Sequence, residues 1–279
     1  MAGVEEMVRN KQVVLKHFVV GEPKETDMEF RVGKASLRIP EGVEGAILVK
    51  NLYLSCDPYM RGRMREYYES YIPPFQPGSV IEGFGVAKVV DTTSPKFSVG
   101  DYIVGLTGWE EYSVIIRTEQ LRKIETHDVP LSYHVGLLGM PGFTAYVGFY
   151  EICAPKKGDY FFVSAASGAV GQLVALMNMR VHGRVAICGM VSQHSISDPK
   201  GISNLYTLVM KRVRMQGFIQ SDYLHLHPEF LKTIVSFYKQ GKIVYIEDMN
   251  EGLENGPAAF VGLFSGKNVG KQIVCVTRE

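Results

Sequence analysis

The sequence predicts an α/β protein in two parts, a β-rich front part and, behind it, an α/β part of the nucleotide-binding type. Two observations carry this prediction. Before about residue 125, short apolar runs alternate with Gly, Pro and Asp, a spacing that favours an irregular β-barrel or sandwich. Further along, an apolar run leads into a glycine turn and a helical pattern, which is how a doubly wound dinucleotide-binding fold begins.

The front part contains most of the strand-like runs. They are rich in Val, Ile, Leu and Tyr, residues that suit a pleated and half-buried surface. We expect strands over residues 12–15, 36–39, 46–54, 79–81, 85–90, 102–104 and 112–115. Around residues 135–146 the pattern turns helical, so the boundary between the parts should lie near residue 125.

The rear part alternates strands with helices, as a parallel sheet requires. In its last helix, four apolar residues recur at helical spacing, so we interpret this stripe, Phe230, Ile234, Phe237 and Tyr238, as core packing. A closing strand over 272–276 could return to either part. The other elements we expect are strands over 160–164, 184–188 and 215–219, and helices over 173–179 and from Pro228 to before Gly241.

The glycine turn has the spacing Ala165-x-x-Gly168-x-x-Gly171. Small residues let the backbone approach a pyrophosphate, and the first N–H groups of the following helix face the anion. Such a fold should present an Asp or Glu for the ribose about 20 residues later. Residues 188–194 contain none. On this motif alone, a structural turn that binds no cofactor remains an alternative.

Composition argues against a nucleic-acid-binding, membrane-spanning or secreted protein. Lys and Arg number 30 against 29 Asp and Glu, so the net charge is +1 and no overall field attracts nucleic acid or an anionic membrane. The four cysteines form no Cys-x-x-Cys pair, the N-terminus lacks a signal-peptide pattern, and no apolar run approaches the roughly 18 residues of a membrane span. We therefore expect a cytoplasmic protein with reduced thiols.

The sequence lacks the residue patterns of a catalytic zinc site and of a serine hydrolase. A catalytic zinc needs a Cys-His-Glu type of ligand set, and His225 and His227 have no third partner at a suitable spacing. The Gly-x-Ser-x-Gly elbow of a serine hydrolase is absent. We expect no metal site.

Several ordered motifs give the chain a family resemblance. They are NLYLSCDPYMR over 51–61, WEEY over 109–112, GMPG over 139–142 with TAY over 144–146, SAASGAVGQ over 164–172, CGM over 188–190, QGF over 216–218 and GKNVGKQ over 266–272. With these motifs the chain resembles the plant NADPH-dependent alkenal and enone double-bond reductases. These are zinc-independent medium-chain dehydrogenases/reductases of the leukotriene B4 12-hydroxydehydrogenase-like branch. The resemblance implies a GroES-like β-barrel domain over 1–125, a Rossmann-type NADP-binding domain over 126–265, and a C-terminal segment, 266–279, that returns to the first domain.

The resemblance also implies a reaction, the transfer of hydride from NADPH to the β-carbon of an α,β-unsaturated aldehyde or ketone. Tyr53 matches the family's active-site tyrosine and would stabilise the enolate oxygen, although an aromatic residue packed on a strand is the alternative. His194 falls where the family has a second tyrosine and could donate a proton, or could be an ordinary loop histidine. Phe75 matches an aromatic residue over the substrate.

The same resemblance assigns the cofactor contacts. It places the pyrophosphate against the glycine turn and the nicotinamide half against the Cys-Gly-Met strand end. Cys188 could equally be a small buried hydrophobe. The residues implied are Ser167, Gly168, Ala169, Val170, Cys188, Gly189, Met190, Val191, Ser192, Gln193, His194, Phe218, Ile219 and Asn268.

The chain departs from the family pattern between Val174 and Ala175. Members of the family have about 65 more residues there, covering most of one half of the cofactor fold. The adenosine-ribose strand and the residues that meet the 2′-phosphate would be lost with them. We therefore expect lowered stability, exposed apolar faces and weak NADPH binding. The family's homodimer forms through the sheet edge of this same domain, so the shortening also bears on dimerisation.

Two functions of different class follow from these observations. The first is an NADPH-dependent enone reductase that uses Tyr53 and His194. The second is a catalytically silent relative that acts as a structural or dimer-partner protein because its cofactor domain is incomplete. An excess of aromatic residues favours aryl-conjugated substrates, and those residues are Tyr53, Tyr59, Tyr67, Tyr68, Tyr71 and Phe75.

Overall fold

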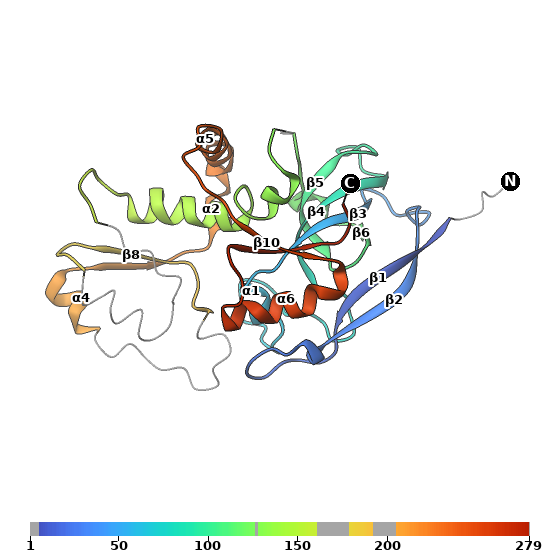
Figure 1. Ribbon diagram of the computed structural model, residues 1–279, viewed down its shortest axis with the longest axis horizontal. Coiled ribbons are helices and arrows are strands. Elements are labelled where there is room, and N and C mark those ends of the chain that lie inside the picture. Colours follow the sequence, from blue (N-terminus) through green and yellow to red (C-terminus); the bar gives the residue numbers. More distant parts are fainter. Residues whose placement is uncertain (1–5, 126–127, 161–178, 192–204, 279) are drawn as a thin grey trace. The chain divides into compact units, whose positions relative to one another are not determined.

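A computed structural model describes residues 6–125, 128–160, 179–191 and 205–278. The chain forms two compact units, shown in one view in Figure 1. Unit 1 comprises Met1–Val19, Pro23–Gly136 and Tyr245–Glu279, and unit 2 comprises Val20–Glu22 and Leu137–Val244. The chain therefore re-enters unit 1 at Tyr245, whereas the sequence predicts that only residues 266–279 return to the first domain.

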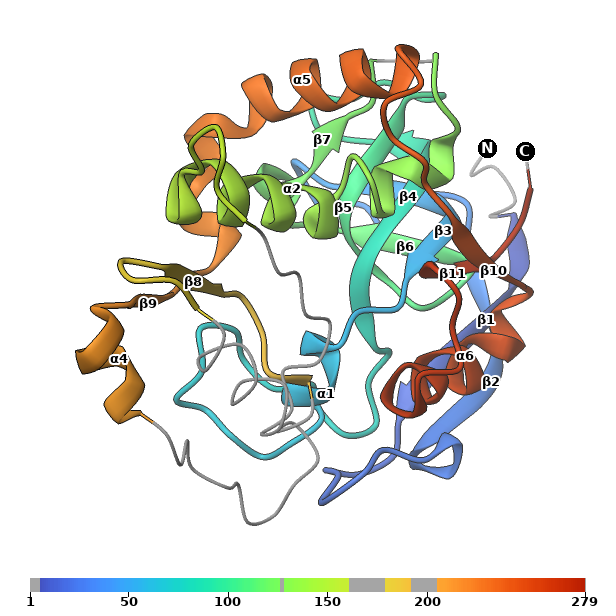
Figure 2. The ribbon, with the colours of Figure 1, turned by 60° about the vertical axis from the view of Figure 1, so that its left-hand side comes forward.

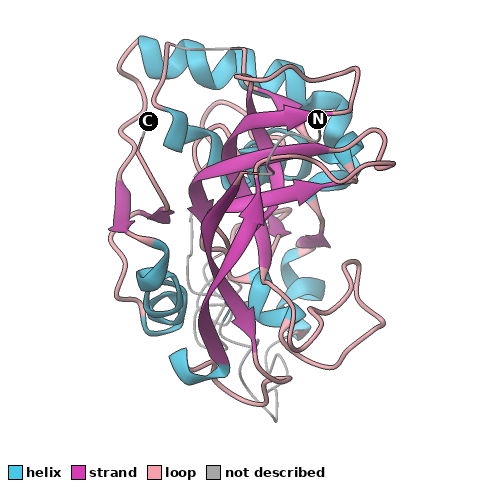
Figure 3. Cartoon of the chain, turned by 90° about the vertical axis from the view of Figure 1, so that its right-hand side faces the viewer, coloured by secondary structure: helices cyan, strands magenta, loops and turns pink. Residues whose placement is uncertain are grey.

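Unit 1 is built on a seven-stranded sheet with the order β10-β11-β3-β4-β5-β7, in which β6 also pairs with β3 (Figures 2 and 3). A separate antiparallel hairpin, β1 and β2, is joined to it by the bridges Gln12–Glu110 and Val14–Val80. The strands are β1 Met7–Leu15, β2 Met28–Ser36, β3 Ile47–Ser55, β4 Glu82–Thr92, β5 Tyr102–Gly108, β6 Tyr112–Ile115, β7 Arg122–Lys123, β10 Glu247–Glu251 and β11 Lys271–Cys275.

Strand β3 changes partner halfway along one edge. Its first half, Ile47 to Lys50, pairs with β6, and its last residues, Tyr53 to Ser55, pair with β11. Asn51 lies between the two halves and is fully buried, and its Nδ2 donates to Glu110 O at 2.8 Å and to Ser113 Oγ at 2.9 Å. On the other edge, pairing with β4 is irregular between Asn51 and Tyr53. Such irregularities re-aim the next side chain, here Tyr53.

A partly buried carboxylate connects the hairpin to this sheet. Glu110 accepts hydrogen bonds from Asn10 Nδ2 at 3.1 Å, Gln12 Nε2 at 2.6 Å and Ser113 Oγ at 2.8 Å. Burial raises the pKa of Glu110, and the three donors oppose that rise. The Trp-Glu-Glu-Tyr motif therefore supplies both a fully buried Trp109 and the polar link between β1 and β6.

The C-terminal segment completes unit 1. β10 and β11 are parallel, and β11 is antiparallel to β3. Helix α6, Gly256–Gly262, covers Trp109, and Phe260 meets its ring edge-on at 6.2 Å between centroids. A Cβ on Gly256 would lie 3.0 Å from that indole, so any larger residue would require the packed ring to shift. The core of unit 1 therefore includes residues from both ends of the chain.

Unit 2 contains α2, Met140–Tyr146, which continues as a π-helix over Val147–Cys153. α2 packs against α5 in one core cluster of Phe143, Tyr146, Val147, Ile152 and Phe230. Phe230 and Ile234 of the helical stripe are confirmed as core packing, the first fully buried and the second packed against the cluster, whereas Phe237 and Tyr238 are only partly buried outside it. The other helices and strands described in unit 2 are β8 Arg184–Ile187, α4 Tyr206–Lys211, β9 Arg214–Gly217 and α5 His227–Lys239.

Apolar side chains are exposed in unit 2. β8 and β9 form a parallel sheet of two strands, and α4 has no buried residue. Its Tyr206, Val209 and Met210 are 72%, 70% and 61% exposed. A helix normally buries an apolar face against a sheet, so this exposure is what we expect beside a sheet that has two strands within the described residues.

Two predicted strands are wrong. β2 ends at Ser36, and the predicted run over 36–39 instead leads to Pro40, with the Ile39 N–H donating to Asp91 Oδ2 at 2.9 Å. The predicted strand over 79–81 makes one isolated bridge, Val14–Val80. The first run bends at Leu37 and Arg38. The second bonds to β1, where Ser79 O accepts from Leu15 N and Ile81 N donates to Val13 O, but it is too short to form a strand. The predicted strand over 160–164 and helix over 173–179 lie almost wholly outside the described residues.

Candidate active site

Tyr53 lies on β3, directly after the pairing irregularity. It stands opposite Val86 of β4 and Cys275 of β11, and its partly buried ring packs against the core cluster that includes Leu52, Val86 and Ile273. Burial raises the pKa of the Tyr53 hydroxyl, and the nearby Cys275 raises it further. The hydroxyl therefore stays protonated at neutral pH and is available as a hydrogen-bond donor.

Phe75 is buried rather than open to one side. It is 4% exposed and belongs to the core cluster that contains Leu54 and Met60. The guanidinium of Arg63 lies over its ring, 4.1 Å from the centroid. One face of the ring is thus covered, and Phe75 is a core residue that leaves little surface for a substrate. Tyr53 packs in a different cluster.

A buried ion pair follows β3 closely. Lys271 Nζ donates to Asp57 Oδ1 at 3.0 Å and to Cys56 O at 2.7 Å, and the two charged side chains are only 11% and 3% exposed. Burial raises the pKa of the Cys56 thiol to about 12, so this cysteine is an uncharged core residue. The pair fastens the start of β11 to the end of β3.

Two of the predicted cofactor segments lie side by side in unit 2. β8 and β9 are in register from Arg184 opposite Arg214 to Ile187 opposite Gly217, so their carboxyl ends coincide. Phe218 N donates to Ile187 O at 3.0 Å. Residues 188–191 follow one strand and Phe218 and Ile219 follow the other. In open parallel sheets this edge is where ligands bind, so the described residues fit the nicotinamide half of a dinucleotide.

The remaining predicted cofactor residues are placed differently. Asn268 belongs to unit 1, where its Nδ2 donates to Gly270 O at 2.8 Å in the turn before β11. Ser167, Gly168, Ala169, Val170, Ser192, Gln193 and His194 lie outside the described residues.

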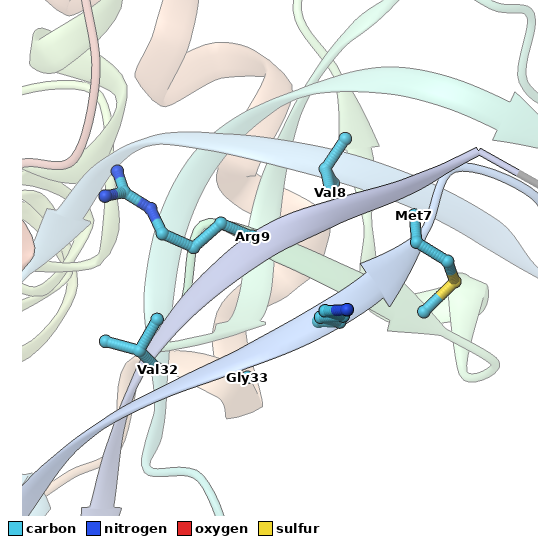
Figure 4. Close-up of a pocket in the computed structure, with 6 residues that line it drawn as sticks. Met7, Val8, Arg9, Val32 and Gly33 are labelled. Atoms are coloured by element: carbon cyan, nitrogen blue, oxygen red, sulfur yellow. The ribbon is translucent and has the colours of Figure 1, made fainter.

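The surface pocket in Figure 4 lies on the β1–β2 hairpin of unit 1. It is lined by Met7, Val8, Arg9, Val32, Gly33 and Lys34, and none of the predicted site residues is among them. In the described parts of the chain, no group of three His, Cys, Asp or Glu side chains is placed to hold a metal ion. None of the helices described is long and apolar enough to cross a membrane.

Comparison with known proteins gives consistent matches. Residues 11–124 match the family model described as the N-terminal domain of oxidoreductase. The chain is 46% identical to the NADP(+)-dependent 2-alkenal reductase of Nicotiana tabacum, covering 98% of this chain and 99% of that protein. It is 42% identical to the (+)-pulegone reductase of Mentha piperita, covering 98% and 100%.

A solved structure shares the fold. The crystal structure of CurA in complex with NADPH from Vibrio vulnificus matches with a TM-score of 0.83 and 29% identity, covering 98% of this chain and 100% of that one. Together with the family model, this likeness confirms the predicted α/β fold class with its β-barrel front domain.

The alignment length bears on the predicted shortening. The match to the tobacco protein spans 342 positions, 63 more than the 279 residues of this chain. At least 63 residues of the tobacco protein therefore have no counterpart here. Because both proteins are covered almost from end to end, the difference is internal. The predicted position, 174–175, lies outside the described residues.

Proposed function

Since the chain belongs to the alkenal/enone reductases of the medium-chain dehydrogenase/reductase family, we propose that it reduces the carbon–carbon double bond of α,β-unsaturated aldehydes or ketones with NADPH. The name of the tobacco relative states both that it reduces 2-alkenals and that it depends on NADP(+). The observation that supports the proposal most directly is Tyr53, a protonated and partly buried donor on β3.

Charge develops on the substrate's carbonyl oxygen during this reaction. NADPH, when bound, supplies hydride to the β-carbon, and the resulting enolate is protonated at the α-carbon. Tyr53 donates a hydrogen bond to the enolate oxygen, which lowers the barrier because the bond strengthens as charge grows. The pairing irregularity beside Asn51 aims the tyrosine, and the buried Asn51 amide holds that irregularity in place.

The cofactor would be held by the strand ends of unit 2. Residues 188–191 and 218–219 present backbone groups and mostly apolar side chains at the coincident ends of β8 and β9. Gly189 has open space where a Cβ would lie, so a flat ring could approach its backbone. The glycine turn, 167–170, would hold the pyrophosphate.

We further propose that His194 acts as a proton donor near the carbonyl. Replacing His194 with Ala is expected to lower turnover roughly tenfold or more, whereas Tyr should restore most of it, because the phenol is also a donor. Steady-state kinetics of both variants checks this. Equal turnover in wild type, His194→Ala and His194→Tyr would remove His194 from the mechanism.

The test of the proposed function is direct titration of the 279-residue chain with NADPH and NADH, followed by nicotinamide fluorescence and thermal shift. We expect NADPH to bind, but about a hundredfold more weakly than to the tobacco relative, since contacts to the adenosine half are lost and each tenfold is about 1.4 kcal/mol. Turnover of an enone should accompany binding.

A chimera provides the control. Inserting the extra segment of the tobacco protein between Val174 and Ala175 should restore tight NADPH binding if the strand ends form a genuine half-site. A folded chain that binds neither nucleotide and reduces no enone would favour the silent relative. A chimera that also fails to bind would overturn the assignment of the strand ends.

A further inference from the structure

Three neighbouring strands of unit 1 bring Tyr53 into one row with a thiol and a carboxylate. Glu251 of β10 stands opposite Cys275 of β11, and Cys275 stands opposite Tyr53 of β3. Figure 2 shows these three strands side by side. Residues that face each other across a strand pair have their side chains on the same face of the sheet, with Cβ atoms about 4.5–5.5 Å apart. The Glu251 side chain therefore lies on the same face of the sheet as the Tyr53 ring.

The segment that follows β11 adds a cation to this row. Val276 N donates to Leu52 O at 2.8 Å, so the chain stays beside β3 after the strand ends. The guanidinium of Arg278 then forms an ion pair with the carboxylate of Glu251. Arg278 is therefore held close to β3 and beside the residue that ends β10.

The charges of the row act on Tyr53. Glu251 and Glu247 raise the pKa of its hydroxyl, in addition to the effect of burial, whereas Arg278 lowers that pKa. Burial and a hydrogen bond with Glu251 raise the pKa of the Cys275 thiol to about 11, so the thiol is uncharged at neutral pH. Within the described residues, the charges that Tyr53 meets are therefore two carboxylates and one guanidinium.

The two carboxylates differ in their partners. Glu247 accepts a hydrogen bond from Ser132 Oγ at 2.8 Å, and Glu251 is paired with Arg278. The remaining surroundings of Tyr53 are mostly apolar, and Tyr102 is a further titratable side chain packed against the same cluster. Apolar surroundings screen charges poorly, so the Arg278 charge matters at the Tyr53 hydroxyl. The apolar members of the cluster are Leu52, Val86, Val104, Ile124, Val135 and Ile273, with Leu131 and Met249 packed against them.

We propose that Arg278 is a positioning residue that acts through Tyr53: by neutralising Glu251, it keeps the tyrosine hydroxyl a strong donor to the enolate oxygen. The inference rests on the proposed function and deepens it. Negative charge grows on the carbonyl oxygen in the transition state, and an unpaired carboxylate in the same row would oppose that charge. The two paired side chains are 75% and 56% exposed, and such pairs add little to stability. The effect of Arg278 should therefore appear in catalysis and not in unfolding.

The experiment changes each charge of the pair separately. Arg278→Gln leaves Glu251 unpaired, so we expect kcat for enone reduction to fall about two- to fivefold. Glu251→Gln leaves the cation unpaired, so kcat should rise about twofold, and the double variant should return close to wild type. In about 1 M NaCl, where charges are screened beyond about 3 Å, these differences should shrink. Arg31→Gln, at an exposed ion pair with Glu29, is the matched control.

A second readout follows Tyr53 without NADPH and without turnover. Tyr53 is replaced by 3-fluorotyrosine, whose more acidic phenol titrates before alkali unfolds the chain, and its pKa is measured by fluorine NMR. We expect this pKa to rise in Arg278→Gln, to fall in Glu251→Gln and to stay unchanged in Arg31→Gln. The urea midpoint should be the same in all of these proteins, which separates a change in charge from a change in fold.

The two readouts distinguish this inference from the proposed function. If the chain reduces no enone but the pKa moves in the expected directions, the charge balance holds and the reductase assignment does not. A pKa that moves in neither variant would overturn the inference, whatever the turnover. So would an active enzyme in which both single variants lower kcat alike, since the pair would then be structural, or in which neither changes it.

Discussion

Tyr53→Phe is expected to lower kcat for enone reduction by a factor of about 10² to 10³, with a much smaller change in KM. The substitution keeps the ring that packs with Leu52, Val86 and Ile273 but removes the hydroxyl. Since the hydrogen bond to the enolate oxygen strengthens only as charge develops, its loss should appear in kcat. Steady-state kinetics at saturating NADPH measures both constants.

Tyr112→Phe on β6 is the matched control for this variant. Its ring is also partly buried and burial raises its pKa, but it packs in a cluster that does not include Tyr53. Its activity should be unchanged. Because burial raises the pKa of Tyr53 above its ordinary value of 10, the hydroxyl remains protonated from pH 6 to 9 and the ratio of wild type to variant should be constant there. A Tyr53→Phe protein with full kcat would assign Tyr53 to packing alone.

Lys271→Met should lower the free energy of unfolding of the protein by about 3–5 kcal/mol. The change leaves the Asp57 carboxylate, which is 3% exposed, without the cation 3.0 Å away. An unpaired buried charge costs far more than the pair contributes, so removal of one partner is the severe change. Urea denaturation followed by Trp109 fluorescence measures the effect, since this indole lies in the core of unit 1.

The double variant distinguishes charge from shape. Asp57→Asn combined with Lys271→Met removes both charges and should recover much of the lost stability. Lys267→Met, at an exposed lysine of the same segment, should be nearly neutral. If Lys271→Met proved as mild as the Lys267 control, the ion pair would be solvated in solution and would not fasten β11 to β3.

Strands with continuous apolar patterns were predictable from the sequence. The runs over 46–54, 85–90 and 112–115 fall within or almost match β3, β4 and β6. β10, by contrast, reads Glu-Asp-Met-Asn-Glu and has little intrinsic preference for a strand. It forms because β11 offers a parallel edge, a tertiary effect that local pattern does not contain.

The residues of the candidate site likewise fall into those visible in the local sequence and those that depend on the tertiary fold. Tyr53 could be proposed because it stands in a motif that resembles a family. Arg63 and Lys271 were not identified, because their roles depend on partners that the fold supplies, and Lys271 is 214 residues from Asp57. One signal was present for Arg63, a charged residue in a short helix between the apolar Met60 and Met64, both fully buried. A charge in such a position predicts a partner but does not identify it.

The pairing of β3 with β11 has a consequence for synthesis of the chain on the ribosome. Tyr53 is opposite Cys275, which is made roughly 220 residues later. At about 5–20 residues per second, the last third of β3 waits roughly 10–45 s for its neighbour. During that time an apolar strand edge has no partner, which is the kind of edge that other nascent chains can extend. The nascent unit 1 therefore needs its open β3 edge shielded from other chains until β11 has left the ribosome.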